Sequence, residues 1–163
     1  MDDFEIKKRE LLQPVLFEAG AALMDCQGFE YGVALLLFHF GRLGTPGLDP
    51  NKLTDVLDDT DKKTAGQLVA MLKRHVTVSD GIDQALTEAL AARNRLIHRI
   101  LIENIEQVVT EDGRAALIQQ IRRIRSTVRK GDSMLQPFIN AFSEALDGVE
   151  LARVHEEVRS AFG

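Results

Sequence analysis

The chain has 163 residues, and its 45% hydrophobic and 28% charged residues are typical of an ordinary globular protein. One domain spanning 1–163 is expected, because this length buries a core without disulfides. The most apolar run, Val33–Phe38, is far shorter than the roughly 20 residues that cross a bilayer, and the charged N-terminal residues lack an apolar signal core. Cys26 is the one cysteine, which excludes an internal disulfide. We therefore expect a reduced, cytoplasmic protein without a membrane segment.

Positive charge is concentrated in one part of the chain although the net charge is −5. Between Ala91 and Lys130, nine lysines and arginines oppose four acids, so this segment carries +5 and the remainder −10. A basic region on an acidic protein can attract polyanions such as RNA. The alternative is that these arginines form solvated helix faces and local ion pairs.

Apolar residues recur every three or four positions and strand alternation is scarce, which predicts an all-α fold, an antiparallel bundle of about five helices. The expected helices, in chain order, are a lead-in at 4–12, a long helix from Pro14 to Phe40 ended by Gly41–Gly44, a short helix at 51–57 begun by Asp49-Pro50, and helices at 62–75, 80–109, 111–130 and 133–161. The expected N-caps are Thr60 or Asp61, Ser79 or Asp80, Thr110 and Asp132, and Gly131 is expected to stop the fifth helix.

The chemically suggestive segment is Arg93-Asn94-Arg95-Leu96-Ile97-His98-Arg99, on the expected helix at 80–109. On a helical wheel Arg93 lies on one flank of an apolar stripe, and Asn94 and His98 lie on the other. Arg95 and Arg99 point towards solvent or a partner. The stripe itself comprises Leu86, Leu90, Ile97, Leu101 and Val108. Because Arg93 and His98 are about 140° apart, they can act together only if a cleft or a second subunit wraps the stripe.

These residue types suit work on a phosphodiester. A histidine can take the proton from a ribose 2′-hydroxyl or give one to a leaving oxygen, and an arginine fork can hold a phosphate at two points. No metal is needed for that scheme. The structural alternative is that Asn94 satisfies a buried backbone group, His98 lies at the core edge and Arg93 pairs with a nearby acid.

The Arg-Asn-x-x-x-His pattern at Arg93, Asn94 and His98, near the start of a long helix in an all-α bundle, resembles the HEPN superfamily. The resemblance implies a metal-independent endoribonuclease of a toxin, defence or RNA-processing system. It also implies a homodimer whose two motif helices build one composite site in a cleft. There Arg93 would contact the scissile phosphate, His98 would transfer a proton or bind phosphate, and Asn94 would orient one of them. A protein partner such as an antitoxin is a further expectation.

Other candidates carry simpler interpretations. Arg95, Arg99, Arg122 and Arg125 are expected to bind RNA phosphates, without base stacking, because no aromatic residues interleave with them. We expect no metal site and no cofactor, since the histidines lack ligand spacing and no phosphate-binding glycine loop is present. Cys26 and His39 are expected in the core, His75 at the end of a helix and His155 in solvent. Glu30 and Tyr31 are expected on the solvent side of their helix rather than in a cleft against the motif helix.

A non-catalytic helical module that binds a protein partner or a nucleotide, on the same fold, remains the alternative function. It is favoured by the acidic remainder of the chain and by a narrow seam on the last helix, which predicts that changes at Phe138 or Phe142 alter self-association. The seam consists of Leu135, Phe138, Phe142, Ala145, Val149 and Ala152.

Overall fold

The structure, a computed structural model, describes residues 3–58, 63–148 and 156–161, and its elements over these residues are all helices. The all-α prediction is therefore confirmed. The elements are α1 (Asp3–Arg42), α2 (Pro50–Leu57), α3 (Ala65–His75), α4 (Asp80–His98), α5 (Ile100–Glu103), the 3-10 helix η1 (Ile105–Val109) and α6 (Glu111–Asp147), and residues 156–161 are helical as well.

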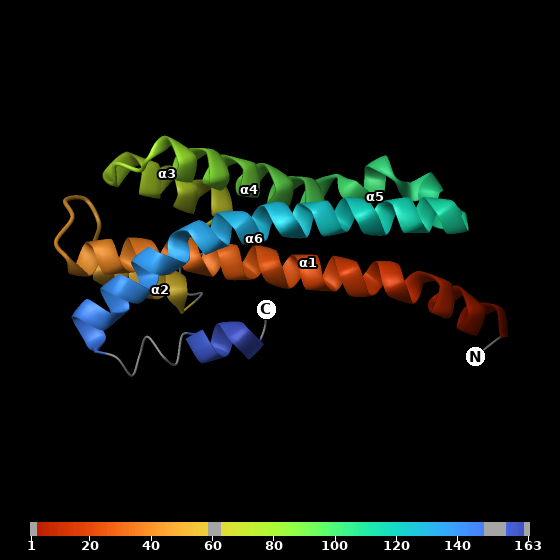
Figure 1. The fold of residues 1–163 in the computed structure, drawn as a ribbon, viewed down its shortest axis with the longest axis horizontal. Coiled ribbons are helices and arrows are strands. Elements are labelled where there is room, and N and C mark those ends of the chain that lie inside the picture. Colours follow the sequence, from red (N-terminus) through yellow and green to blue (C-terminus); the bar gives the residue numbers. More distant parts are fainter. Residues whose placement is uncertain (1–2, 59–62, 149–155, 162–163) are drawn as a thin grey trace.

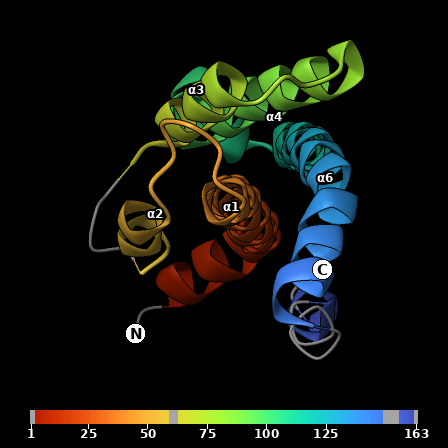
Figure 2. The ribbon, with the colours of Figure 1, turned by 90° about the vertical axis from the view of Figure 1, so that its left-hand side faces the viewer.

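Two long helices, α1 and α6, lie side by side, and α4 packs along α6 (Figure 1). Figure 2 looks along α1, which has α2, the α3–α4 pair and α6 around it. The buried core runs between these helices and contains Phe29, Leu86 and Leu117. α4 is thus held between α6 and one side of α1, and this arrangement fixes the position of the motif segment.

The helices α1 and α6 run in the same direction, which corrects the expectation of an antiparallel bundle. Contacts join Glu18 to Arg122, Asp25 to Arg125 and Arg42 to Asp147, with sequence separations of 104, 100 and 105 residues. A nearly constant separation requires two parallel helices in register. The chain returns through α3 and α4 before α6 begins, and α4 runs opposite to both long helices (Figure 1).

Helix starts with a local capping signal are where the sequence predicts them. Asp49 accepts a hydrogen bond from the Asn51 backbone at 2.9 Å, and Thr110 accepts one from Gly113 at 3.1 Å. Ser79 caps α4 in the same way. α3 differs, because Thr64 and Gln67 form a reciprocal capping box and the helix begins at Ala65 rather than at 62.

Two expected helix breaks are absent, and two breaks occur inside expected helices. Pro14 lies inside α1, so the lead-in and the long helix are one helix, and Gly131 lies inside α6, so the last two expected helices are also one. The expected helix at 80–109 instead ends at His98, because the backbone leaves helical geometry at Arg99 (φ −130°, ψ −35°). The chain continues as α5 and η1. The last expected helix does not run without a break to 161, because α6 ends at Asp147 with Gly148 as its C-cap.

The break after His98 changes the apolar stripe predicted for this segment. Ile97 and Leu101 are exposed, whereas Ile100 is buried. The buried Asn104 donates its side-chain amide to the Ile100 carbonyl at 2.7 Å, which holds the turn. The stripe is therefore interrupted at the end of α4, where Ile97 and Leu101 face outwards, and Val108 on η1 is half-buried against the core.

By length and composition alone, one helix of the described residues, the Glu5–Arg42 part of α1, could cross a membrane. The apolar character of α1 thus extends well beyond Val33–Phe38. Half of its most apolar window is buried inside the fold, as in the core helix of a globular protein.

Candidate functional site

The motif residues line one open surface pocket of about 620 Å³ at the end of α4. Arg93, Asn94 and His98 share it with Arg95 and Arg99. Its remaining lining comes from α4, α5 and the start of α3, namely Ala91, Glu103, Thr64 and Gly66. Thr64 and Gly66 at the start of α3 form a second wall. Arg93 and His98 therefore line the same pocket without a second subunit.

Arg93 is fixed by an ion pair with α1. Its Nε donates to Glu30 Oε1 at 2.7 Å, and the two side chains are 18% and 26% exposed. Its Nη1 also donates to Asn94 Oδ1 at 3.2 Å. Glu30 therefore faces Arg93 on α4, and the expectation that it lies on the solvent side of its helix is wrong. The guanidinium still has N–H donors on Nη1 and Nη2 for an anion in the pocket.

His98 and Arg99 lie where α4 ends, and both are exposed. Among the described residues no hydrogen bond or ion pair engages either side chain. The motif therefore closes a helix of 19 residues, whereas the HEPN resemblance places it near the start of a long one. This departure leaves the residue types and their spacing intact, but it alters their position in the fold.

Arg95 belongs to a polar network beneath the pocket. Its Nε donates to Glu103 at 3.2 Å and its Nη2 donates to Gln120 Oε1 at 3.1 Å. The Gln120 amide in turn donates to Asn104 Oδ1 at 3.1 Å. This chain links α4, the turn after it and α6, so it holds the rim of the pocket in place.

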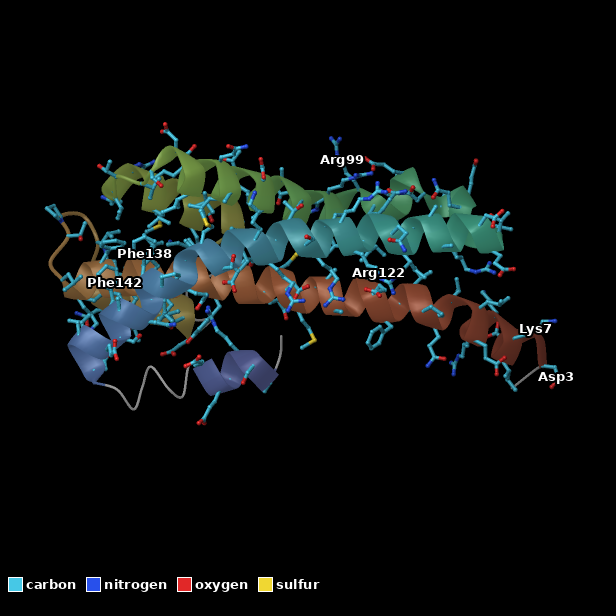
Figure 3. All side chains as sticks on the ribbon, in the orientation of Figure 1. Asp3, Lys7, Arg99, Arg122, Phe138 and Phe142 are labelled. Carbon is cyan, nitrogen blue, oxygen red and sulfur yellow. The ribbon has the colours of Figure 1, made fainter. Side chains whose placement is uncertain are left out.

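Arg122 and Arg125 lie apart from the pocket, between α6 and α1. Arg122 donates to Glu18 at 2.7 Å, and Arg125 donates to Asp25 at 2.8 Å and to Glu18 at 3.1 Å. Figure 3 shows Arg122 on the α1 side of α6 and Arg99 on the outer side of α4 and α5. These two arginines form the local ion pairs of the alternative interpretation, and their charge is balanced within the chain.

Buried ion pairing shifts the proton affinity of these groups. The hydrogen bond from Arg122 lowers the pKa of Glu18 below its usual value of 4.5, against the opposing effect of burial. The hydrogen bond to Asp25 raises the pKa of Arg125. Both groups are therefore charged at neutral pH.

The remaining histidines and Cys26 have structural roles where they are described. Cys26 is buried, and burial raises the pKa of its thiol to about 11, so it is a core residue and not a nucleophile. His39 is also buried, 3.1 Å from the Ser143 hydroxyl, and His75 ends α3, both as expected. His155 lies outside the described residues. The described residues contain no cluster of three potential metal ligands.

The seam predicted on the last helix is partly used inside the chain. Leu135 is buried, and the Phe142 ring packs edge-on against Phe40 with 5.0 Å between centroids. Phe138 is 42% exposed. Phe142 is therefore a packing residue, while Val149 and Ala152 lie outside the described residues.

Comparison of the chain with protein-family models, with curated proteins and with solved structures found no match.

The sequence pattern missed the acid that orients Arg93. Glu30 stands 63 residues before Arg93, and no local pattern couples them. A signal was nevertheless present, since a carboxylate interrupts an otherwise apolar stretch of α1. Such a charge needs a partner when it is half-buried.

Proposed function

We propose that this protein acts on RNA through the pocket at the end of α4, as a HEPN-like, metal-independent endoribonuclease of a toxin, defence or RNA-processing system. The observation that carries the proposal is that Arg93, Asn94 and His98 share one open pocket with two further arginines, Arg95 and Arg99. The exposed Arg99, which forms no ion pair among the described residues, supports a polyanionic substrate. A cytoplasmic location belongs to the same proposal.

The chemistry follows from the residue types. Arg93, held by Glu30, binds the scissile phosphate and stabilises the charge that develops on it. An imidazole of His98 takes the 2′-hydroxyl proton, the 2′-oxygen attacks phosphorus, and the bond to the 5′-oxygen breaks. The leaving oxygen takes a proton from a second acid. The products are a 2′,3′-cyclic phosphate and a 5′-hydroxyl.

A homodimer is part of the proposal because the reaction needs an acid and a base together. One pocket offers one imidazole, and a second copy would bring another His98. Leu101 and Ile102, on the turn after His98, are 60% and 78% exposed and offer a second subunit apolar contact beside the pocket. These side chains support a composite cleft at this end of α4.

The test is cleavage of a single-stranded RNA in the presence of a chelator. Wild type should release fragments that end in cyclic phosphate, and His98→Ala should lower the rate by roughly 10²- to 10⁴-fold, the usual contribution of a positioned proton-transfer group. Arg123→Ala is the control, because Arg123 is an exposed α6 arginine outside the pocket. Equal cleavage by wild type and His98→Ala in repeated preparations would refute catalysis by this pocket.

A non-catalytic interaction module is the second candidate function. The observation that favours it is the large exposed apolar area of α1, which includes Leu16 and Phe17 at 65% and 72% exposure. In that case His98→Ala leaves every measured property unchanged, while substitutions on α1 alter association.

A further inference from the structure

The helix α1 is apolar on its outer side as well as on its core side. Its outer face, defined here as Leu16, Phe17, Gly20, Leu23, Met24 and Tyr31, lies within about 60° of Gly20 on a helical wheel, and the neutral Gln13 and Gln27 are exposed on the same side. The five large side chains are 42–72% exposed. No exposed residue between Gln13 and Tyr31 is charged. Large apolar side chains that are exposed together on one helix face mark an interaction site, so this face is expected to have a partner.

The charges of this part of α1 are all turned inwards. Glu18 and Asp25 bond to arginines of α6, and Glu30 bonds to Arg93 of α4. The outer face is therefore neutral, while the chain as a whole carries −5. Two copies of an acidic protein repel each other least where each presents such a neutral surface.

Gly20 makes no close packing contact with the rest of the described residues. A Cβ built there meets nothing within 4 Å, and the backbone is helical. Glycine inside an exposed helix costs about 1 kcal/mol relative to alanine. The absence of a side chain at the centre of the outer face does, however, allow a second helix to approach closely.

We propose that the outer face of α1 binds the same face of a second copy, with the two α1 helices antiparallel about a two-fold axis at Gly20. Such a contact is self-complementary, because residue i of one copy lies opposite residue 40 − i of the other. Leu16 then meets Met24 and Phe17 meets Leu23, so large apolar side chains face each other. The face also follows the alternating four- and three-residue spacing of paired helices at Phe17, Gly20, Met24, Gln27 and Tyr31.

A second copy fits this face better than a lipid surface does. Helices that lie on membranes carry lysines and arginines on the side opposite their apolar face. On α1 that opposite side instead carries Glu18 and Asp25, and α6 packs against it. Residues 156–161 border the face near Tyr31 but leave that side chain 46% exposed. None of the face residues lines the Arg93 pocket, so this inference goes beyond the proposed function.

The first experiment is oxidative cross-linking of Gly20→Cys. A residue on the two-fold axis lies opposite the same residue of the second copy, so Gly20→Cys should form a disulfide-linked dimer. The control, Gly81→Cys, should remain a single chain over the same time. Gly81 is an equally open, exposed glycine on α4. Cys26 does not interfere because it is buried. Equal cross-linking of the two variants would overturn the proposal.

The second experiment measures mass in solution for Phe17→Glu and Ile102→Glu. Phe17→Glu should weaken the α1 contact by about tenfold or more and lower the mass of the assembly. Ile102→Glu, which lies outside the outer face, should leave the Gly20→Cys cross-link intact. An unchanged mass for Phe17→Glu would overturn the proposal. A wild type that is a single chain and floats with anionic vesicles would also overturn it, and would show that the outer face binds lipid instead. RNA cleavage by Phe17→Glu is measured in parallel, so failure of the proposed activity is distinguished from failure of this contact.

Discussion

At the scale of single residues, the ion pair between Glu30 and Arg93 is the contact that most affects the candidate site. Glu30 binds Nε of Arg93, and this orients the guanidinium along α4. Both side chains are largely buried, so the pair is screened less than an ion pair in solvent. The direction of the Arg93 fork is thus determined by α1 as well as by the motif helix.

We predict that Glu30→Gln lowers the free energy of unfolding by about 1–3 kcal/mol, because a half-buried guanidinium loses its charged partner. RNA cleavage should fall about tenfold or more at unchanged secondary structure, since Arg93 loses its orientation. Urea unfolding and single-turnover cleavage measure the two effects. The matched control for the unfolding measurement is Glu103→Gln, whose pair with Arg95 is 48% and 41% exposed and should contribute less than about 1 kcal/mol to stability. Equal losses for the two variants would contradict the argument.

The motif could be found from the sequence, but its surroundings could not. The types and spacing of Arg93, Asn94 and His98 are local properties, and all three lie on the one helix α4. The pocket needs Thr64 from α3 and the pair needs Glu30 from α1, and both are contacts between distant segments. Local periodicity carries no information about which helix packs against which flank.

At the scale of elements, Gly131 shows how packing overrides a local stop signal. It lies inside α6 without a positive φ, at the place where α6 crosses α4 and α1. A Cβ built there would lie 2.5 Å from the Ala89 Cβ and 3.4 Å from the Phe29 ring. The glycine allows the helices to approach closely and does not end the helix.

Gly131→Ala should therefore destabilise the protein by about 1–3 kcal/mol, because the overpacking strain exceeds the gain of about 1 kcal/mol in helix propensity. Thermal unfolding followed by circular dichroism measures the change. Gly81→Ala is the control, since its Cβ would lie in open space in the first turn of α4, and it should stabilise slightly. Stabilisation by both substitutions would mean that Gly131 does not mediate close packing.

Helix boundaries divide into those with a local cause and those without one. Asp49, Ser79 and Thr110 cap their helices through their own side chains, and the sequence located each of these starts. The end of α4 has no glycine or proline. It depends on burial of Ile100 and on the bond between Asn104 and Gln120, which is a tertiary contact. The sequence pattern therefore continued that helix too far.

At the scale of the whole molecule, a layer of carboxylates and guanidiniums joins the two parallel helices. Glu18 and Asp25 project from α1, and Arg122 and Arg125 project from α6. The carboxylate side chains are 9% exposed, so their charges are balanced almost entirely by these arginines. Protonating a carboxylate would leave an arginine of α6 without its counter-charge. The stability of the bundle should therefore depend on pH.

Acid should destabilise the fold through the loss of the Glu18 ion pairs. The pKa of Glu18 is lower in the folded chain than its ordinary 4.5, so its contribution is complete above about pH 4.5 and is lost as pH falls through the folded value. Glu18→Gln should lower the free energy of unfolding by about 1–3 kcal/mol at neutral pH and flatten its decline in acid. Urea unfolding between about pH 7 and pH 3 measures both.

Asp132 provides a control of opposite sign for the same titration. Burial raises the pKa of Asp132 above 3.8, so as pH falls the folded chain binds a proton there at a higher pH than the unfolded chain does. This proton uptake offsets part of the decrease in the free energy of unfolding in acid. Asp132→Asn removes the offset and should make the decline in acid steeper, while Glu18→Gln makes it shallower. If the two substitutions change the slope in the same direction, then the ion pairs between α1 and α6 do not control the acid stability of the fold.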